Sequence, residues 1–133
     1  MDKVHEFNPV IYPFKLWVVK EGITINEIDE MFDAINDDGY GVSYSDVYKS
    51  LLDHGTDATT FIVGHKKQGV KGCLVVMGRK VKIKSLSHEA DHCADYLFED
   101  IGDTRRSFDG GEPYAYYQSW VFECLYNVKR GKL

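Results

Sequence analysis

Apolar residues recur at helical spacing in four segments of this 133-residue chain. The spacing predicts helices over Ile25–Asn36, Ser45–His54, Leu86–Asp100 and Tyr114–Val128. Thr24, with Glu27 three residues later, forms the pattern of a capping box in front of the first helix. Pro113 precedes the last helix, and proline is favoured in the first turn of a helix. These start signals support the assignment of the first and last helices.

Short runs rich in β-branched and aromatic residues predict strands over Lys15–Lys20, Thr59–Gly64 and Gly72–Met77. The last two runs are separated by a loop at Lys66–Gly69, so we expect them to pair as a hairpin. Basic and apolar residues then alternate, which indicates that a strand resumes over Val81–Lys84 with its lysines in solvent. No linker or repeat divides the chain. We therefore expect a single α+β domain over residues 1–133, with a small, mainly antiparallel sheet packed against the third helix and a C-terminal helix.

The third predicted helix has two chemically different faces. Its apolar positions form one stripe, which consists of Leu86, Ala90, Cys93, Ala94, Leu97 and Ile101. His88 and His92 fall on another face and, being four residues apart, lie on the same side of the helix. With Glu89 they form the motif His-Glu-x-x-His. A helix that contacts a core on one side and binds a ligand on the other has this separation.

Zinc hydrolases use such a motif in a specific way. Neutral imidazole nitrogens of His88 and His92 bind Zn²⁺, and the Glu89 carboxylate takes a proton from a water on the ion. The alternative is a surface helix that is rich in histidine and glutamate for no chemical reason. The motif makes the zinc site the stronger hypothesis.

A catalytic zinc commonly has three protein ligands and an open position for water. Glu112 opens the last predicted helix, and an antiparallel packing of that helix on the motif helix would return its carboxylate toward the ion. The alternative for Glu112 is a carboxylate that only favours the helix dipole. Glu123, deeper in the same helix, is the second candidate for the third ligand.

His88-Glu89-x-x-His92, followed by Glu112 in Gly-Gly-Glu-Pro-Tyr-Ala-Tyr, resembles the zincin metallopeptidases of the gluzincin type, and in particular small zincin-like proteins encoded by phages and mobile elements. The resemblance covers about Val81 to Val128. It implies a zincin-like fold in which His88, His92 and Glu112 bind zinc and Glu89 is the general base. It also implies that the strand before the motif helix, Cys73–Met77, holds an extended peptide or protein substrate by edge pairing.

The oxyanion that forms during hydrolysis is usually stabilised by a further histidine or tyrosine in such enzymes. Tyr114, Tyr116 and Tyr117 all lie near Glu112 in the sequence, and Tyr116 shares its helix face at four residues' distance. Spacing alone leaves all three open. We take Tyr116 as the candidate.

Three alternatives remain. His-Glu-x-Asp-His with Gly72-Cys73-Leu74 upstream is similar to the metal motif of peptide deformylases, although Cys73 falls in an apolar strand and is better explained as core. A non-catalytic, zinc-stabilised accessory or interaction module would retain the same site. A structural protein with no metal is the third.

Composition restricts the partners and the compartment. The net charge of −5 argues against nucleic acid. The three cysteines are an odd number and widely spaced, which indicates free thiols in a reducing compartment. No apolar run approaches the roughly 20 residues of a membrane span, and Met1–Pro9 lacks the pattern of a signal peptide. We expect a cytoplasmic protein without a membrane partner.

Overall fold

A six-stranded sheet lies at the centre of the residues that the computed structural model describes, which are 4–20, 23–35, 41–42, 57–101 and 111–131. Its strands, in chain order, are β1 (Val4–Phe7), β2 (Lys15–Val19), β3 (Phe32–Ile35), β4 (Gly41–Val42), β5 (Ala58–His65) and β6 (Lys71–Met77). The spatial order is β1-β2-β6-β5-β3-β4. Only β2 and β6 pair in parallel, and every other neighbouring pair is antiparallel. The predicted mainly antiparallel α+β architecture is confirmed.

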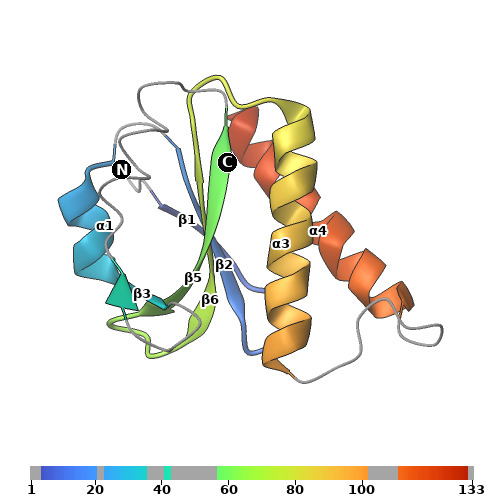
Figure 1. Ribbon diagram of the computed structural model, residues 1–133, viewed down its shortest axis with the longest axis horizontal. Helices are drawn as coiled ribbons and strands as arrows, with labels where there is room; N and C mark the ends of the chain where they lie inside the picture. The colour runs from blue at the N-terminus through green and yellow to red at the C-terminus, as the bar shows by residue number, and fades with distance from the viewer. Residues whose placement is uncertain (1–3, 21–22, 36–40, 43–56, 102–110, 132–133) are drawn as a thin grey trace.

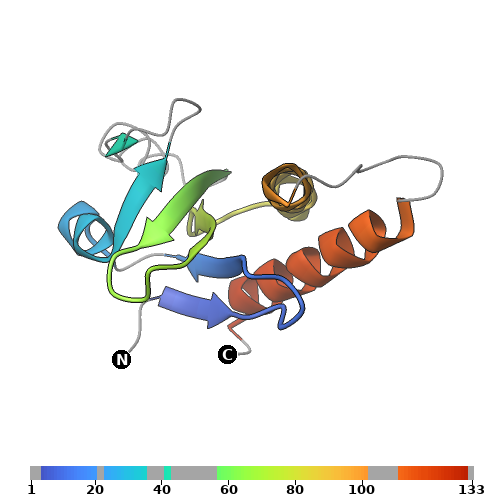
Figure 2. The same cartoon turned by 90° about the horizontal axis from the view of Figure 1, so that it is seen from below.

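Helices cover both faces of this sheet. They are α1 (Ile25–Met31), α3 (Ile83–Asp100) and α4 (Gly111–Lys129). Figure 1 shows α3 and α4 on one side of the sheet and α1 on the other. In Figure 2, α3 is seen nearly end-on while α4 runs across the view, so the two helices cross at an angle. None of the helices in the described ranges is both long and apolar enough to span a bilayer.

The apolar stripe of α3 fixes how that helix sits on the sheet. Leu86, Ala90 and Leu97 are fully buried, in one cluster with side chains of β6 such as Val75. Each buried leucine contributes roughly 1.5–3 kcal/mol. The partly exposed ion pair between Lys71 and Asp100 contributes at most about 1 kcal/mol. Hydrophobic burial therefore sets the rotation of α3 about its own axis.

Most predicted elements are present. The strands at Lys15–Lys20, Thr59–Gly64 and Gly72–Met77 correspond to β2, β5 and β6, and β5 and β6 form the expected hairpin. The predicted capping box of α1 is confirmed, with both of its hydrogen bonds at 3.1 Å. The helices α3 and α4 each begin three residues before the predicted start.

Two predicted elements are wrong. The helix predicted over Ile25–Asn36 ends at Met31, and Phe32–Ile35 is strand β3. Phe32 fits a helical spacing, but it also fits an alternating one, and pairing with β5 decides in favour of the strand. No strand resumes over Val81–Lys84: Val81 is buried ahead of α3, and the helix begins at Ile83. Alternation without a neighbouring strand to pair with does not make a strand.

The position of β6 overturns the prediction that Cys73–Met77 pairs with substrate. β6 is hydrogen-bonded to β2 along one edge and to β5 along the other, so it has no edge for a peptide. The situation differs in β5, which pairs with β3 only at Val63–His65. Among the described strands, none pairs with Ala58 or Thr60 on the β3 side of β5. The predicted helix Ser45–His54 lies outside the described residues.

Gly72 is required where β2 and β6 pair. A Cβ atom at this position would lie 2.0 Å from the Lys15 carbonyl oxygen and 2.7 Å from Cζ3 of Trp17. Both neighbours are fixed, one in a strand backbone and the other in the core. At Gly64 a Cβ would meet only Cδ1 of Ile35, at an ordinary 3.9 Å.

We predict that Gly72→Ala lowers the free energy of unfolding by roughly 3 kcal/mol or more, because the strands must separate to admit the methyl group. The matched variant Gly64→Ala should change it by less than about 1 kcal/mol. Urea unfolding followed by circular dichroism measures both. Equal stability of the two variants would show that β2 and β6 do not pair as described.

Candidate metal centre

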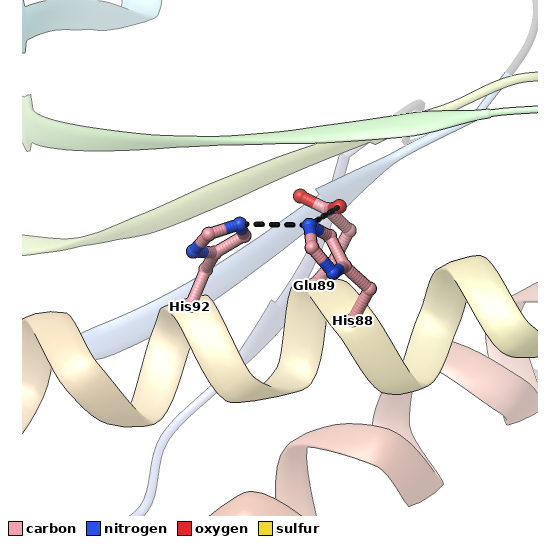
Figure 3. Close-up of side chains that lie close together, drawn as sticks. All are labelled: His88, Glu89 and His92. Carbon is pink, nitrogen blue, oxygen red and sulfur yellow. Dashed lines mark hydrogen bonds and ion pairs between the residues drawn. The ribbon is translucent and has the colours of Figure 1, made fainter.

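His88, Glu89 and His92 lie near the middle of α3, on the side of the helix along which β5 runs (Figure 3). The buried stripe holds the opposite flank of α3 against the core. Successive residues of a helix are rotated by about 100° around its axis. With the stripe held against the core, both imidazoles therefore point away from the core and Glu89 points toward the sheet. The side chain of His88 is 69% exposed, whereas that of Glu89 is 7% exposed. The group therefore stands at the boundary between core and solvent.

The three side chains are close enough to share one ion. Nε2 of His88 lies 3.0 Å from Nε2 of His92, and Oε2 of Glu89 lies 4.0 Å from Nε2 of His88. One ligand atom from each residue falls within 4.8 Å of the others. Two nitrogens bound to a tetrahedral zinc at about 2.0–2.1 Å would be ~3.3 Å apart. The group could hold a metal ion with little movement of either imidazole.

The short distance between the two imidazole nitrogens requires either a proton or a cation between them. Without a metal, a separation of 3.0 Å needs one Nε2 to carry a proton and donate it to the lone pair of the other. A cation bound there would take the place of that proton by accepting both lone pairs. The ring of His92 is also stacked on Tyr96, with centroids 6.2 Å apart and planes 17° from parallel. This stacking limits the freedom of one of the two candidate ligands.

Glu89 is anchored to strand β5. The hydroxyl of Thr60 donates a 2.8 Å hydrogen bond to Oε1 of Glu89, and the Thr60 backbone also hydrogen-bonds with this carboxylate. Burial raises the pKa of Glu89 above its usual value, although the Thr60 hydroxyl and the two imidazoles act in the opposite direction. The carboxylate thus has one bound oxygen, Oε1, and a second oxygen, Oε2, beside the imidazoles.

The structure does not describe the side chain of the predicted third ligand. Glu112 lies in the first turn of α4, and its side chain is outside the described residues, so its role stays a prediction. Two residues later, the Tyr114 hydroxyl donates to Oδ1 of Asp91 at 2.7 Å and lies 2.8 Å from Oδ1 of Asp95. These contacts join α4 to the flank of α3 on which Asp91 lies.

Tyr116 lies on another surface. It is 72% exposed and lines a cavity of about 440 Å³ together with Tyr12, Trp120 and neighbouring residues of the segment between β1 and β2. The structure brings His88, Glu89 and His92 together but does not bring Tyr116 beside them. Its proposed contact with an oxyanion stays a prediction.

The cysteines lie in the core. Cys73, Cys93 and Cys124 are free and buried, in agreement with the expectation of free thiols. Burial raises the pKa of Cys73 well above its usual value, and its thiol contacts Cys93. Among the described residues, the group that could hold a metal ion consists of His88, Glu89 and His92 and does not include Cys73. The alternative that is similar to peptide deformylases therefore lacks its sulfur ligand.

Thr60 is the residue of this site that the sequence did not predict. Its strand is 29 positions before Glu89 in the chain, and no spacing rule connects a strand threonine with a helix glutamate. The alternating pattern of β5 places Thr60 and Ile62 on one face, but only the position of α3 shows which face it is.

Comparisons with protein-family models, with curated proteins and with solved structures find no match for this chain.

We predict that His88→Ala and His92→Ala each weaken Zn²⁺ binding by more than the roughly 10- to 100-fold that is typical when only an outer hydrogen-bond partner of a ligand is lost. His5→Ala, in β1 and outside the group, is the matched control and should bind zinc like the wild type. Competition with a chromophoric chelator, on protein without a histidine tag, measures the affinities. Unchanged affinity in both α3 variants would exclude the site.

Proposed function

We propose that the protein is a zinc-dependent hydrolase of the zincin type that cleaves peptide bonds. In this proposal His88 and His92 bind Zn²⁺ and Glu89 acts as the general base. The observation that carries the proposal is the 3.0 Å separation of the two Nε2 atoms beside a buried carboxylate. Imidazole nitrogens are donors that zinc prefers in hydrolytic sites, and a carboxylate beside them can accept a proton from a bound water.

The chemistry assigned to each residue follows from its position. Zinc bound to the imidazoles would lower the pKa of a bound water toward 7 and polarise the carbonyl group under attack. Oε2 of Glu89, which faces the imidazoles, would accept the proton of that water and later give it to the leaving amine. His88 is exposed, so a substrate has access to the ion from the solvent side.

The described sheet offers a place for an extended substrate. Ala58 and Thr60 of β5 have no described strand beside them on the side of β3, and Thr60 contacts Glu89 directly. A peptide that pairs with β5 there would pass close to Oε2 of Glu89. In this proposal, pairing of the substrate with β5 takes the place of the pairing with Cys73–Met77, which the central position of β6 excludes. Glu112 as third ligand remains part of the proposal, whereas Tyr116 as oxyanion donor stays a sequence prediction that its position does not support.

A second candidate is a non-catalytic zinc module. Glu89 lies within the same 4.8 Å group as the imidazoles, so it is able to serve as the third ligand itself. A zinc site that uses Glu89 in this way has no base beside the ion. The two candidates differ in what Glu89 does, and one substitution separates them.

We predict that Glu89→Gln keeps zinc affinity within a few-fold of wild type and lowers kcat/KM for peptide cleavage by about 10²–10⁴, since the amide cannot accept a proton. Glu99→Gln, an exposed position on the same helix, should leave both quantities unchanged. A fluorogenic peptide library identifies a cleavable sequence for these measurements. Loss of both zinc and activity in Glu89→Gln would support the non-catalytic module in which Glu89 is a ligand. A zinc-loaded wild type that cleaves no peptide would contradict the peptidase proposal.

A further inference from the structure

The hydrogen bond between Thr60 and Glu89 fixes one oxygen of a carboxylate next to a candidate metal ion. Thr60 Oγ1 donates to Oε1 at 2.8 Å, while Oε2 lies 4.0 Å from Nε2 of His88. The two oxygens of Glu89 therefore have different surroundings. One is bound to the sheet, and the other is directed toward the imidazoles.

We propose that Thr60 is a positioning residue that determines whether Glu89 acts as a base or as a metal ligand. By binding Oε1, the Thr60 hydroxyl holds the carboxylate against β5 and keeps it from moving onto the ion. This inference rests on the proposed zinc site and assigns Thr60 a role in it.

The fold gives Thr60 the rigidity that this role requires. Thr60 is paired with Val75 of β6, inside a seven-residue antiparallel register. Side chains alternate along a strand, so Thr60 faces α3 as Val75 does, whereas Thr59 faces the opposite side of the sheet. The hydroxyl is thus carried by a strand whose position is fixed by its ladder with β6.

The energetics of burial explain why the hydroxyl matters. Glu89 is only 6% exposed, so water does not replace a hydrogen bond that Oε1 loses. A hydrogen bond to an ionised carboxylate is roughly twice as strong as one between neutral groups. Without the hydroxyl, the strongest available partner for the carboxylate would be the cation between His88 and His92. The contact from the Thr60 backbone would remain and would oppose that movement.

Thr60→Val removes the hydroxyl and keeps the shape of the side chain, so we expect the carboxylate of Glu89 to bind the ion directly. Zinc affinity should then rise by about tenfold, because Glu89 adds one more protein ligand to the ion. The visible absorption spectrum of Co²⁺-substituted protein should change in intensity and band position. Peptide cleavage should fall, since the base has become a ligand.

Three further variants make the test specific. Thr60→Ser retains the hydroxyl and should restore wild-type affinity and spectrum. Thr59→Val changes a neighbouring position on the other face of β5 and should have no effect. In a Glu89→Gln background, Thr60→Val should no longer alter zinc affinity, because the residue through which Thr60 acts has lost its charge.

The readouts are zinc affinity by chelator competition, the Co²⁺ spectrum, and circular dichroism to establish that each variant is folded. Wild-type affinity and spectrum in Thr60→Val would overturn the proposal, and so would an effect of Thr60→Val that persists with Gln at position 89. If Thr60→Val does not fold, Thr60→Ala takes its place with the same expectations. A wild type that binds zinc but cleaves no peptide ends the peptidase proposal while the Thr60 comparison still gives its result. A wild type that binds no zinc ends both.

Discussion

The packing of one face of α3 on β5 and β6 is the constraint from which the candidate site follows. Leu86, Ala90 and Leu97 are fully buried, and their burial leaves the helix a single rotation on the sheet. In that rotation His88 points to solvent, His92 is half-buried, and Glu89 falls at the edge of the contact. A rotation by one residue would bury an imidazole and expose a leucine. The buried leucines and alanine thus orient the site although they are not themselves candidate metal ligands.

Glu89 is the point at which core and site meet. A carboxylate at this depth is tolerated only with hydrogen-bond partners or an opposite charge, because burial without them costs several kcal/mol. The hydroxyl of Thr60 supplies the first, and a cation between the imidazoles would supply the second. The Thr60 hydroxyl and such a cation would both interact with the same carboxylate, one at each oxygen. The chemistry of the site depends on how Glu89 divides its two oxygens between them.

Local features were predictable from the sequence. The apolar stripe of α3 and the four-residue spacing of the histidines depend only on helical geometry. The structure reproduces both except at Ile101, which follows the end of α3 and is 38% exposed. Strand order was not predictable, because it depends on contacts between distant segments: β6 lies between β2 and β5, which excludes the substrate pairing expected of Cys73–Met77. For the same reason Phe32 was assigned to a helix, since only its pairing with His65 of β5 makes it part of a strand. Thr60 could not be identified, because its role exists only where β5 and α3 meet.

The central claim is that His88 and His92 together bind a zinc ion. X-ray absorption spectroscopy of the zinc-loaded protein tests it most directly, since it reports the atoms bound to the metal without reference to activity. We predict nitrogen and oxygen ligands at about 2.0–2.1 Å, with the outer scattering of two imidazole rings. A sulfur ligand at about 2.3 Å, or a spectrum without imidazole scattering, would contradict the claim.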